Sequence, residues 1–336
     1  MRATFTQEQS DIAKTVKAMA EGSRPGTRTA LDVGWQAPEV DAALLADFSV
    51  LGVPESAGGV GSSLVDLAVA VEALGQGLAP SAFPAHAAAI QLAVESGSDL
   101  APALDGSQRW VPAVDEPGVA GWLDLVGTAA APVTKTLVPY VEGAEAVVTL
   151  GVDGLTIGVP AAVRERVSFD PSRPLADITS APGQALSAGR GVQRATLVAA
   201  AELCGVAQGA IALAGGHART RQQFGRVIGS FQGVAFQLAE AVALAKAGWD
   251  LTLHAAWAVE NDRDEAEMQV HAAKAAAGKA AVFAAERCIQ VHGGMGITME
   301  ADPHLFLRRA MVLDNWLGSS AWHRRRAGAL RIAARS

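Results

Sequence analysis

Two short stretches of the chain carry side chains that could bind a phosphate-bearing ligand. The first is Arg221-Gln-Gln-Phe-Gly225, and the second is Gln290-Val-His-Gly-Gly-Met-Gly296. A guanidinium group matches two phosphate oxygens at once, and consecutive glycines let the backbone approach a ligand where a Cβ atom would collide. The two stretches therefore indicate a ligand site built from segments that are far apart in the sequence.

Each stretch also has a purely structural interpretation. A basic side chain such as Arg221 complements the dipole at the C-terminus of a helix, and glycine after a helix is typical of a left-handed C-cap. The glycines are not a dinucleotide-binding motif of the Rossmann type, because no strand precedes them and no βαβ unit surrounds them. We interpret His292 as structural. A cap and a ligand contact are compatible, so both interpretations stay open.

The composition limits the classes to which the protein can belong. Half of the 336 residues are apolar, so a large core in two or three structural units is expected. The net charge of −7 and the pI near 5.5 argue against a nucleic-acid partner. No apolar run approaches the roughly 18–20 residues of a membrane span, and the N-terminus lacks a signal-peptide core. We expect a cytoplasmic protein without a membrane association.

The two cysteines do not indicate a metal site. Cys204 and Cys288 both fall in helical patterns, far apart in the sequence and without the spacing of metal ligands. Free cysteine is often buried in reducing compartments. We therefore predict two buried, inert thiols and no metal.

The hydrophobic pattern divides the chain into three parts. The pattern of residues 1–103 predicts an N-terminal helical domain. Residues 104–188 contain short runs rich in β-branched residues that are separated by Gly, Asp or Pro, and this pattern predicts a middle β domain. Residues 189–336 predict an antiparallel bundle of long helices. The expected helices cover 6–21, 38–48, 64–74, 82–94, 193–221, 231–261, 264–292, 303–315 and 320–334, and the expected strands cover 137–141, 146–150 and 155–159.

This order of parts, and several local stretches, resemble the acyl-CoA dehydrogenase family over essentially the whole chain. Residues 51–61 with 66–75 are similar to the family's N-terminal loop and helix, and Ser168-Phe-Asp-Pro-Ser-Arg-Pro-Leu175 is similar to the segment that closes its β domain. The resemblance implies a mainly α fold with a small β domain, in the order helical domain, β domain and helical bundle.

The resemblance also implies FAD as the cofactor. In the family, the arginine at the position of Arg221 grips the pyrophosphate, the phenylalanine at Phe224 packs near the adenosine half, and the glutamine at Gln232 contacts the cofactor. The second stretch corresponds to another flavin-binding segment, which contacts a flavin held mainly by a neighbouring subunit and so implies at least a dimer. The implied cofactor-binding residues are Arg221, Phe224, Gln232, Gln290, Gly293, Gly294 and Ser319.

The chain departs from the family at the catalytic base. Many relatives carry a Tyr-Glu-Gly-Thr segment whose glutamate removes the substrate's α-proton, and Trp316-Leu317-Gly318-Ser319 stands there in this chain. Other relatives place the base at the start of the first bundle helix, where this chain has Ala195. Glu202, two helical turns further along, is a weak candidate for a displaced base. The alternative interpretation of Glu202 is a buried structural carboxylate that a partner satisfies.

The β domain departs as well. The family's two segments that cover the isoalloxazine ring are both incomplete here. Asp115-Glu-Pro-Gly118 is similar to the start of the first, and Gly127-Thr-Ala-Ala130 stands where strand pairing is expected to follow. Trp110 and Trp122 are aromatic residues near this part of the chain. Core packing is the better interpretation of both.

These features are similar to those of the short subunit of the actinobacterial heterotetrameric acyl-CoA dehydrogenases. The resemblance implies a flavin-sharing subunit that lacks the base and acts with a longer homologue, or with itself, on a bulky acyl-CoA such as a steroid side-chain thioester, with an electron-transfer acceptor. Two alternatives stay open. One is a self-sufficient dehydrogenase that uses Glu202, and the other is a scaffold subunit without flavin.

Overall fold

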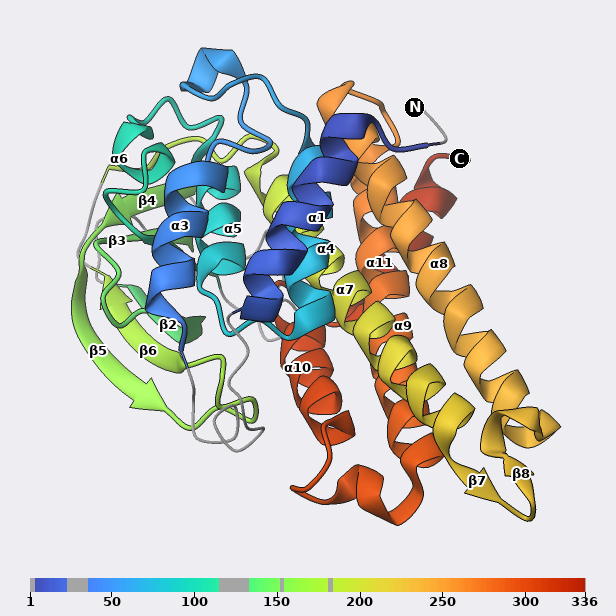
Figure 1. Cartoon of the computed structure of the whole chain (residues 1–336). Coiled ribbons are helices and arrows are strands. Elements are labelled where there is room, and N and C mark those ends of the chain that lie inside the picture. The colour runs from blue at the N-terminus through green and yellow to red at the C-terminus, as the bar shows by residue number, and fades with distance from the viewer. Residues whose placement is uncertain (1–3, 23–35, 115–132, 152–153, 181–183, 336) are drawn as a thin grey trace.

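The computed structural model describes residues 4–22, 36–114, 133–151, 154–180 and 184–335. Helices dominate, and two small sheets lie to one side of a long helical bundle (Figure 1). The predicted fold class, mainly α with a small β part in the middle of the chain, is confirmed.

Short apolar helices form the N-terminal part. α4 begins after Ser63, because the Ser63 side chain accepts the Asp66 N–H and the Asp66 carboxylate accepts the Ser63 N–H. This reciprocal cap satisfies two donors that the first turn of a helix leaves free. The elements here are α1 (Gln7–Gly22), α3 (Pro38–Phe48), η1 (Glu55–Ala57), α4 (Leu64–Gly77), α5 (Phe83–Ala93) and α6 (Ala101–Leu104).

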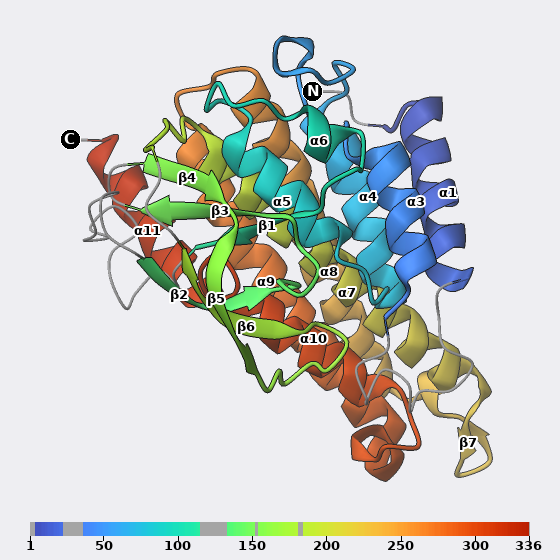
Figure 2. The same cartoon turned by 90° about the vertical axis from the view of Figure 1, so that its left-hand side faces the viewer.

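Two three-stranded sheets follow, one of order β1-β3-β4 and one of order β2-β6-β5 (Figure 2). β1 pairs with β3 in parallel, and the other pairs of these two sheets are antiparallel. Trp110 in β1 is buried in the core, as predicted, whereas Trp122, Asp115–Gly118 and Gly127–Ala130 lie outside the described residues. The strands are β1 (Trp110–Ala113), β2 (Val133–Pro139), β3 (Ala146–Gly151), β4 (Gly154–Gly158), β5 (Pro160–Arg166) and β6 (Leu175–Ser180).

The predicted strand runs match β3 and β4 but differ from the structure elsewhere, and β1, β5 and β6 were not among them. The strand expected over 137–141 is β2, which instead ends at Pro139, and both Leu137 and Tyr140 have a φ of 55°. A left-handed residue interrupts the regular pleat, and the pairing of β2 with β6 shifts between Lys135 and Val138. β5 was not predicted, because it is an edge strand whose side chains are mostly exposed and whose pattern is not apolar.

The bundle consists of long helices that run antiparallel to their neighbours in sequence. α7 and α8 are joined by a two-stranded hairpin, which projects from the lower end of the bundle in Figure 1. α10 runs back along the bundle from the turn η3, and α11 is the last helix of the described chain (Figure 1). The elements are α7 (Gly191–Thr220), β7 (Gln222–Gln223), β8 (Arg226–Val227), η2 (Ile228–Ser230), α8 (Gln232–Glu260), α9 (Ala266–His292), η3 (Gly293–Ile297), α10 (Pro303–Asn315) and α11 (Ser320–Ala333).

α7 is the central helix of the molecule. It is long and apolar enough by length and composition to cross a membrane, but 78% of its most apolar stretch is buried inside the protein, as in the core helix of a globular domain. Its backbone touches that of α4, because a Cβ atom added at Gly205 would lie 2.1 Å from the Glu72 carbonyl oxygen. Glycine is therefore required at this crossing.

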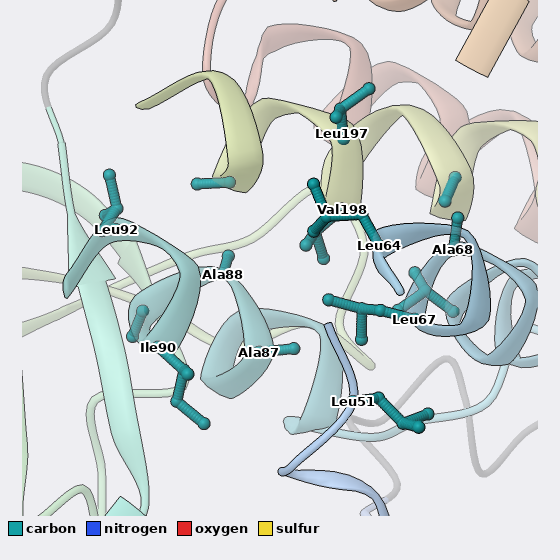
Figure 3. Close-up of a cluster of buried hydrophobic side chains, with 14 of the residues drawn as sticks. Leu51, Leu64, Leu67, Ala68, Ala87, Ala88, Ile90, Leu92, Leu197 and Val198 are labelled. Carbon is teal, nitrogen blue, oxygen red and sulfur yellow. The ribbon is translucent and has the colours of Figure 1, made fainter. Parts of the chain in front are cut away.

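The core joins α7 to the N-terminal helices. Figure 3 shows Val198 of α7 facing Leu64 and Leu67 of α4, with residues of α5 completing the cluster, while Leu197 projects from the other side of α7. Cys204 and Cys288 are free and buried, as predicted. Burial raises the pKa of each thiol to about 12, so both stay protonated and inert near neutral pH.

Candidate functional site

The two predicted ligand-binding stretches meet at a surface groove at the hairpin end of the bundle. Phe224 in the hairpin and Gln290 in the last turn of α9 both line this groove, which has a volume of about 400 Å³. Tertiary structure therefore brings together residues that the sequence separates. The other lining residues, most of them apolar and none of them singled out from the sequence as a cofactor contact, are Gln223, Ile228, Phe231, Gly233, Val234, Gln237 and Val291.

The hairpin backbone holds Phe224 out in solvent. Gln223 pairs with Arg226, so Phe224 and Gly225 form a two-residue turn in which φ is 52° and 76°. Positive φ at both positions is the geometry that matches the twist of a tight hairpin. As a result the Phe224 side chain is 93% exposed, and its ring meets only the edge of Phe231 within the hairpin region. The turn presents an aromatic ring to whatever occupies the groove.

Two guanidinium groups lie beside the groove. Arg221, the first residue after α7, is exposed, and its side chain has no hydrogen bond or ion pair within the described residues. Arg226 lies over the Phe231 ring, 4.0 Å from its centroid. Partial burial, followed by the charges of His292 and Arg221, lowers the pKa of His217. The positive charges of Arg221 and Arg226 make the mouth of the groove attractive to an anion.

The glycines after α9 are open to solvent. Gly293 ends the helix with φ 64° and ψ −142°, and its N–H donates to the Gln290 carbonyl oxygen. This is not the left-handed cap expected from the sequence, because the chain continues directly into the turn η3. A Cβ atom added at Gly293 or Gly294 would meet nothing within 4 Å. Any close approach that these glycines permit is therefore to a molecule outside this chain.

His292 has a packing role in the structure. Its ring stacks on that of His217 with the centroids 4.1 Å apart, and its Nδ1 lies 2.8 Å from the Cys288 carbonyl oxygen. The stack ties the end of α9 to the last turn of α7, next to Arg221. It therefore supports both predicted stretches at once.

Only Phe224 and Gln290 of the predicted cofactor-binding residues line the groove, and Arg221, Gln232, Gly293, Gly294 and Ser319 lie outside its lining. Gln232 is exposed at the start of α8 and does not line the groove. Ser319 caps α11 by accepting the Trp322 N–H at 3.3 Å. The loop before Ser319 packs against Lys274 of α9, and Gln290 lies four to five helical turns further on, roughly 24 Å away. The predicted site residues thus occupy two separate places.

The two positions at which relatives hold a base fall in the same apolar core. Ala195 is 0% exposed and Leu317 is 3% exposed, and both belong to the cluster that contains Leu197 and Val198 (Figure 3). A side chain at either position is surrounded by hydrocarbon. Neither position holds a group that could accept a proton.

Glu202 is fully engaged by arginines. It is 2% exposed, and it accepts hydrogen bonds from Nη1 of Arg173 at 3.3 Å and from Nη1 of Arg309 at 3.2 Å. Burial alone would raise the pKa of Asp170, but its contacts with Arg309 and Ser172 hold that pKa below the usual range. The network joins the end of the β domain to α7 and α10. Its arginines were missed because their partners are distant in sequence.

The groove fits one half of a flavin dinucleotide. Arg221 supplies an exposed guanidinium group for phosphate, and Phe224 with the apolar walls supplies a surface for an aromatic base. Within the described residues, no group of three or more His, Cys, Asp or Glu side chains is placed to hold a metal.

Comparison with known proteins places the chain in a family. Residues 186–330 match the model of the acyl-CoA dehydrogenase C-terminal domain. The acyl-CoA dehydrogenase IpdE2 of Mycobacterium tuberculosis is 32% identical over 78% of this chain and 76% of its own length. The chain belongs to the acyl-CoA dehydrogenase family. As a member of this family of FAD-dependent oxidoreductases, it has FAD as its cofactor. FadE34 of the same organism is 34% identical over 98% of the chain, which spans 49% of the length of FadE34.

Solved structures of the family share the whole fold. Butyryl-CoA dehydrogenase from Megasphaera elsdenii superposes with a TM-score of 0.86 at 17% identity, covering 99% of this chain and 100% of that one. The ChsE4-ChsE5 complex of Mycobacterium tuberculosis gives 0.85 at 25% identity with full coverage of both chains. The G363A variant of the Tcur3481-Tcur3483 steroid ACAD gives 0.85 at 25% identity, covering 98% of this chain and 99% of that one.

Proposed function

We propose that this chain is a flavin-sharing subunit of an acyl-CoA dehydrogenase and does not supply the catalytic base. In this proposal a longer homologous chain provides the carboxylate that removes the α-proton of a CoA thioester. The observation that carries the proposal is that none of the candidate base positions holds a carboxylate that is free to accept a proton. Leu317 and Ala195 lie in an apolar core, and Glu202 is bound by Arg173 and Arg309.

Several residues of this chain would hold the cofactor. FAD, when bound, accepts the hydride that leaves the β-carbon of the substrate. Arg221 would bind the pyrophosphate, Phe224 would cover the adenosine half, and Gln232 and Gln290 would donate or accept hydrogen bonds at the edge of the groove. The open backbone at Gly293 and Gly294 would let a neighbouring subunit approach. Ser319, at the second place, would face the flavin held by this chain's own β domain.

A heteromeric assembly is supported by the kinds of protein to which the chain is similar. ChsE4-ChsE5 and Tcur3481-Tcur3483 each pair two different chains, and the second is a steroid ACAD. The groove is also incomplete within one chain, because Phe224 is almost fully exposed at its rim. An exposed aromatic ring beside apolar walls is typical of an interface. We extend the proposal to a bulky acyl-CoA, with a steroid side-chain thioester as the first substrate to test.

The two other functions are less consistent with the site. A self-sufficient enzyme would need Glu202 to accept a proton, and that would break its hydrogen bonds with two buried arginines. A scaffold without flavin would have no use for the exposed side chains of Arg221 and Phe224. Both functions remain as outcomes of the experiment below.

The test is co-expression of the chain with its longer homologue, followed by reciprocal substitution. We expect a complex of the two chains that carries the absorption spectrum of bound flavin. Replacing the homologue's catalytic glutamate by glutamine should lower turnover by about 10²–10⁴-fold, whereas Glu202→Gln should leave turnover per folded complex within a few-fold. A loss of turnover on Glu202→Gln with unchanged flavin and subunit ratio would make this chain the catalytic one. A stable complex without flavin would support the scaffold.

A further inference from the structure

Residues 313–319, called the loop below, comprise the last turn of α10 and the connection to α11, and they are fixed by side chains of the neighbouring helices. Four of its carbonyl oxygens accept hydrogen bonds from two buried side chains, Lys274 of α9 and His323 of α11. The loop contains Leu317 and ends at Ser319. It is therefore the segment that the family resemblance places against the flavin.

Lys274 is the larger of the two contributors. Its ammonium group donates to the carbonyl oxygens of Leu313 at 3.2 Å, Asp314 at 2.9 Å and Gly318 at 2.8 Å. An ammonium group has three N–H donors, so these bonds satisfy all of them. The side chain is fully buried, and burial lowers its pKa to about 8. A buried lysine whose donors all go to one loop has the geometry of a clamp.

His323 completes the set through a histidine pair. Its Nε2 lies 2.8 Å from the Leu317 carbonyl oxygen, which can only accept, so Nε2 carries the proton. Burial lowers the pKa of His323 to about 3, so its ring is neutral and its Nδ1 accepts. The Nδ1 of His271 lies 2.7 Å from that atom and must therefore donate. This leaves Nε2 of His271 facing Glu267, 3.7 Å away at the surface.

The conformation of the loop explains why it needs to be held. Leu317 has φ 56° and Gly318 has φ 102°, so two consecutive residues adopt left-handed geometry. A branched residue with a Cβ atom rarely adopts this geometry. The turn also places the Trp316 ring under the Arg173 guanidinium, 4.3 Å from the ring centroid. The hydrogen bonds to Lys274 and His323 hold the backbone in this arrangement.

We propose that Lys274 and His323 are positioning residues that clamp the 313–319 loop and so fix the surface that Ser319 presents to the flavin. The flavin part of this inference rests on the proposed function, whereas the clamp itself does not. Both residues act through the loop and touch no ligand. Removing either should loosen the loop first and weaken flavin binding as a consequence.

The experiment uses matched variants. Lys274→Met removes three donors, and Lys279→Met removes an exposed lysine from the same helix as the control. His323→Leu removes the donor to Leu317, whereas His323→Gln keeps an N–H that can reach the same carbonyl oxygen. Hydrogen exchange of the chain alone reports on the loop, because the N–H groups of Trp316, Gly318 and Ser320 are hydrogen-bonded. Flavin titration of the assembled complex reports on the consequence.

We expect Lys274→Met and His323→Leu to speed exchange in the loop at least tenfold and to weaken flavin binding by a similar factor. His323→Gln should restore both, and Lys279→Met should change neither. Unchanged exchange in the loop, or faster exchange spread evenly over the bundle, would overturn the clamp. Faster loop exchange with unchanged flavin affinity would overturn the positioning role alone. If Lys274→Met does not fold, the two His323 variants still decide. A wild-type complex without flavin would refute the proposed function, and exchange would still test the clamp.

Discussion

Arg309 donates a hydrogen bond from Nη1 to Oε1 of Glu202, 3.2 Å away, at a position that solvent does not reach. The same guanidinium group bonds to Asp170 and Ser172, so one arginine of α10 joins α7 to the end of the β domain. The Glu202 carboxylate, the candidate for a displaced base, therefore belongs to a buried network of ion pairs that connects parts of the fold. Its removal should affect stability before chemistry.

Glu202→Gln should lower the free energy of unfolding by about 3–5 kcal/mol, because it removes the carboxylate that pairs with buried Arg173 and leaves buried Arg309 paired with Asp170 alone. Denaturant unfolding of the variant measures the loss. Glu240→Gln, an exposed substitution on α8, is the control and should change the value by less than about 0.5 kcal/mol. An equally small change for Glu202→Gln would mean that the network contributes little.

Arg221→Ala should weaken flavin retention by about ten- to a hundredfold, because a charge-assisted bond contributes about 1.5–3 kcal/mol. Arg221 is exposed and unpaired within the described chain, so the thermal unfolding of the variant should be unchanged. Flavin absorbance after dilution and gel filtration of the complex measures retention. Arg219→Ala, at the same helix end, should keep its flavin. Full flavin content in the Arg221 variant would show that this arginine does not bind the cofactor.

Leu317→Glu should destabilise the protein and should not make the chain active by itself. The side chain is buried in hydrocarbon, and burial of an unpartnered polar group costs roughly 2–7 kcal/mol. Leu317→Met, which is similar in volume, should cost less than about 1.5 kcal/mol. Melting temperature and turnover of the chain without its homologue are the measurements. A stable, active Leu317→Glu variant would contradict the assignment of this position to a closed core.

Acid should destabilise the protein through its buried neutral histidines. The Nδ1 of His86 accepts the Trp110 N–H, and its Nε2 donates to the Ala103 carbonyl oxygen. Burial lowers the pKa of His86 and of His271 to about 4, and that of His323 to about 3. The ordinary value is 6.5, so the unfolded chain binds more protons between pH 6.5 and about 4.

The stability is therefore fully present above pH 6.5 and falls as the pH drops towards 4. Each unit of pKa shift corresponds to about 1.4 kcal/mol, so the three groups together account for several kcal/mol. Urea unfolding between pH 4.5 and 7.5 measures the slope. His86→Gln should flatten it, and His254→Gln, a partly exposed control on α8, should leave it unchanged. A flat profile for the unmodified protein would show that these histidines are accessible to protons in the folded state.

The sequence by itself determined the fold class, the order of the parts and the family. Long helices such as α7 and α9 were predictable because their apolar residues recur at helical spacing, which is a local property of the chain. The Arg221 and Gln290 stretches were recognisable for a similar reason, since each is a short continuous segment. The absence of a carboxylate at Leu317 was also visible from the sequence.

Tertiary structure decided the environments of these residues. No local pattern reveals that Phe224 and Gln290 line one groove, because the hairpin and the end of α9 meet only when the bundle packs. The state of Glu202 depends on Arg309, more than a hundred positions away in the chain. The clamp on Leu317 depends in the same way on Lys274 and His323. Burial and electrostatic pairing are set by neighbours in space, whereas a sequence pattern reports only neighbours along the chain.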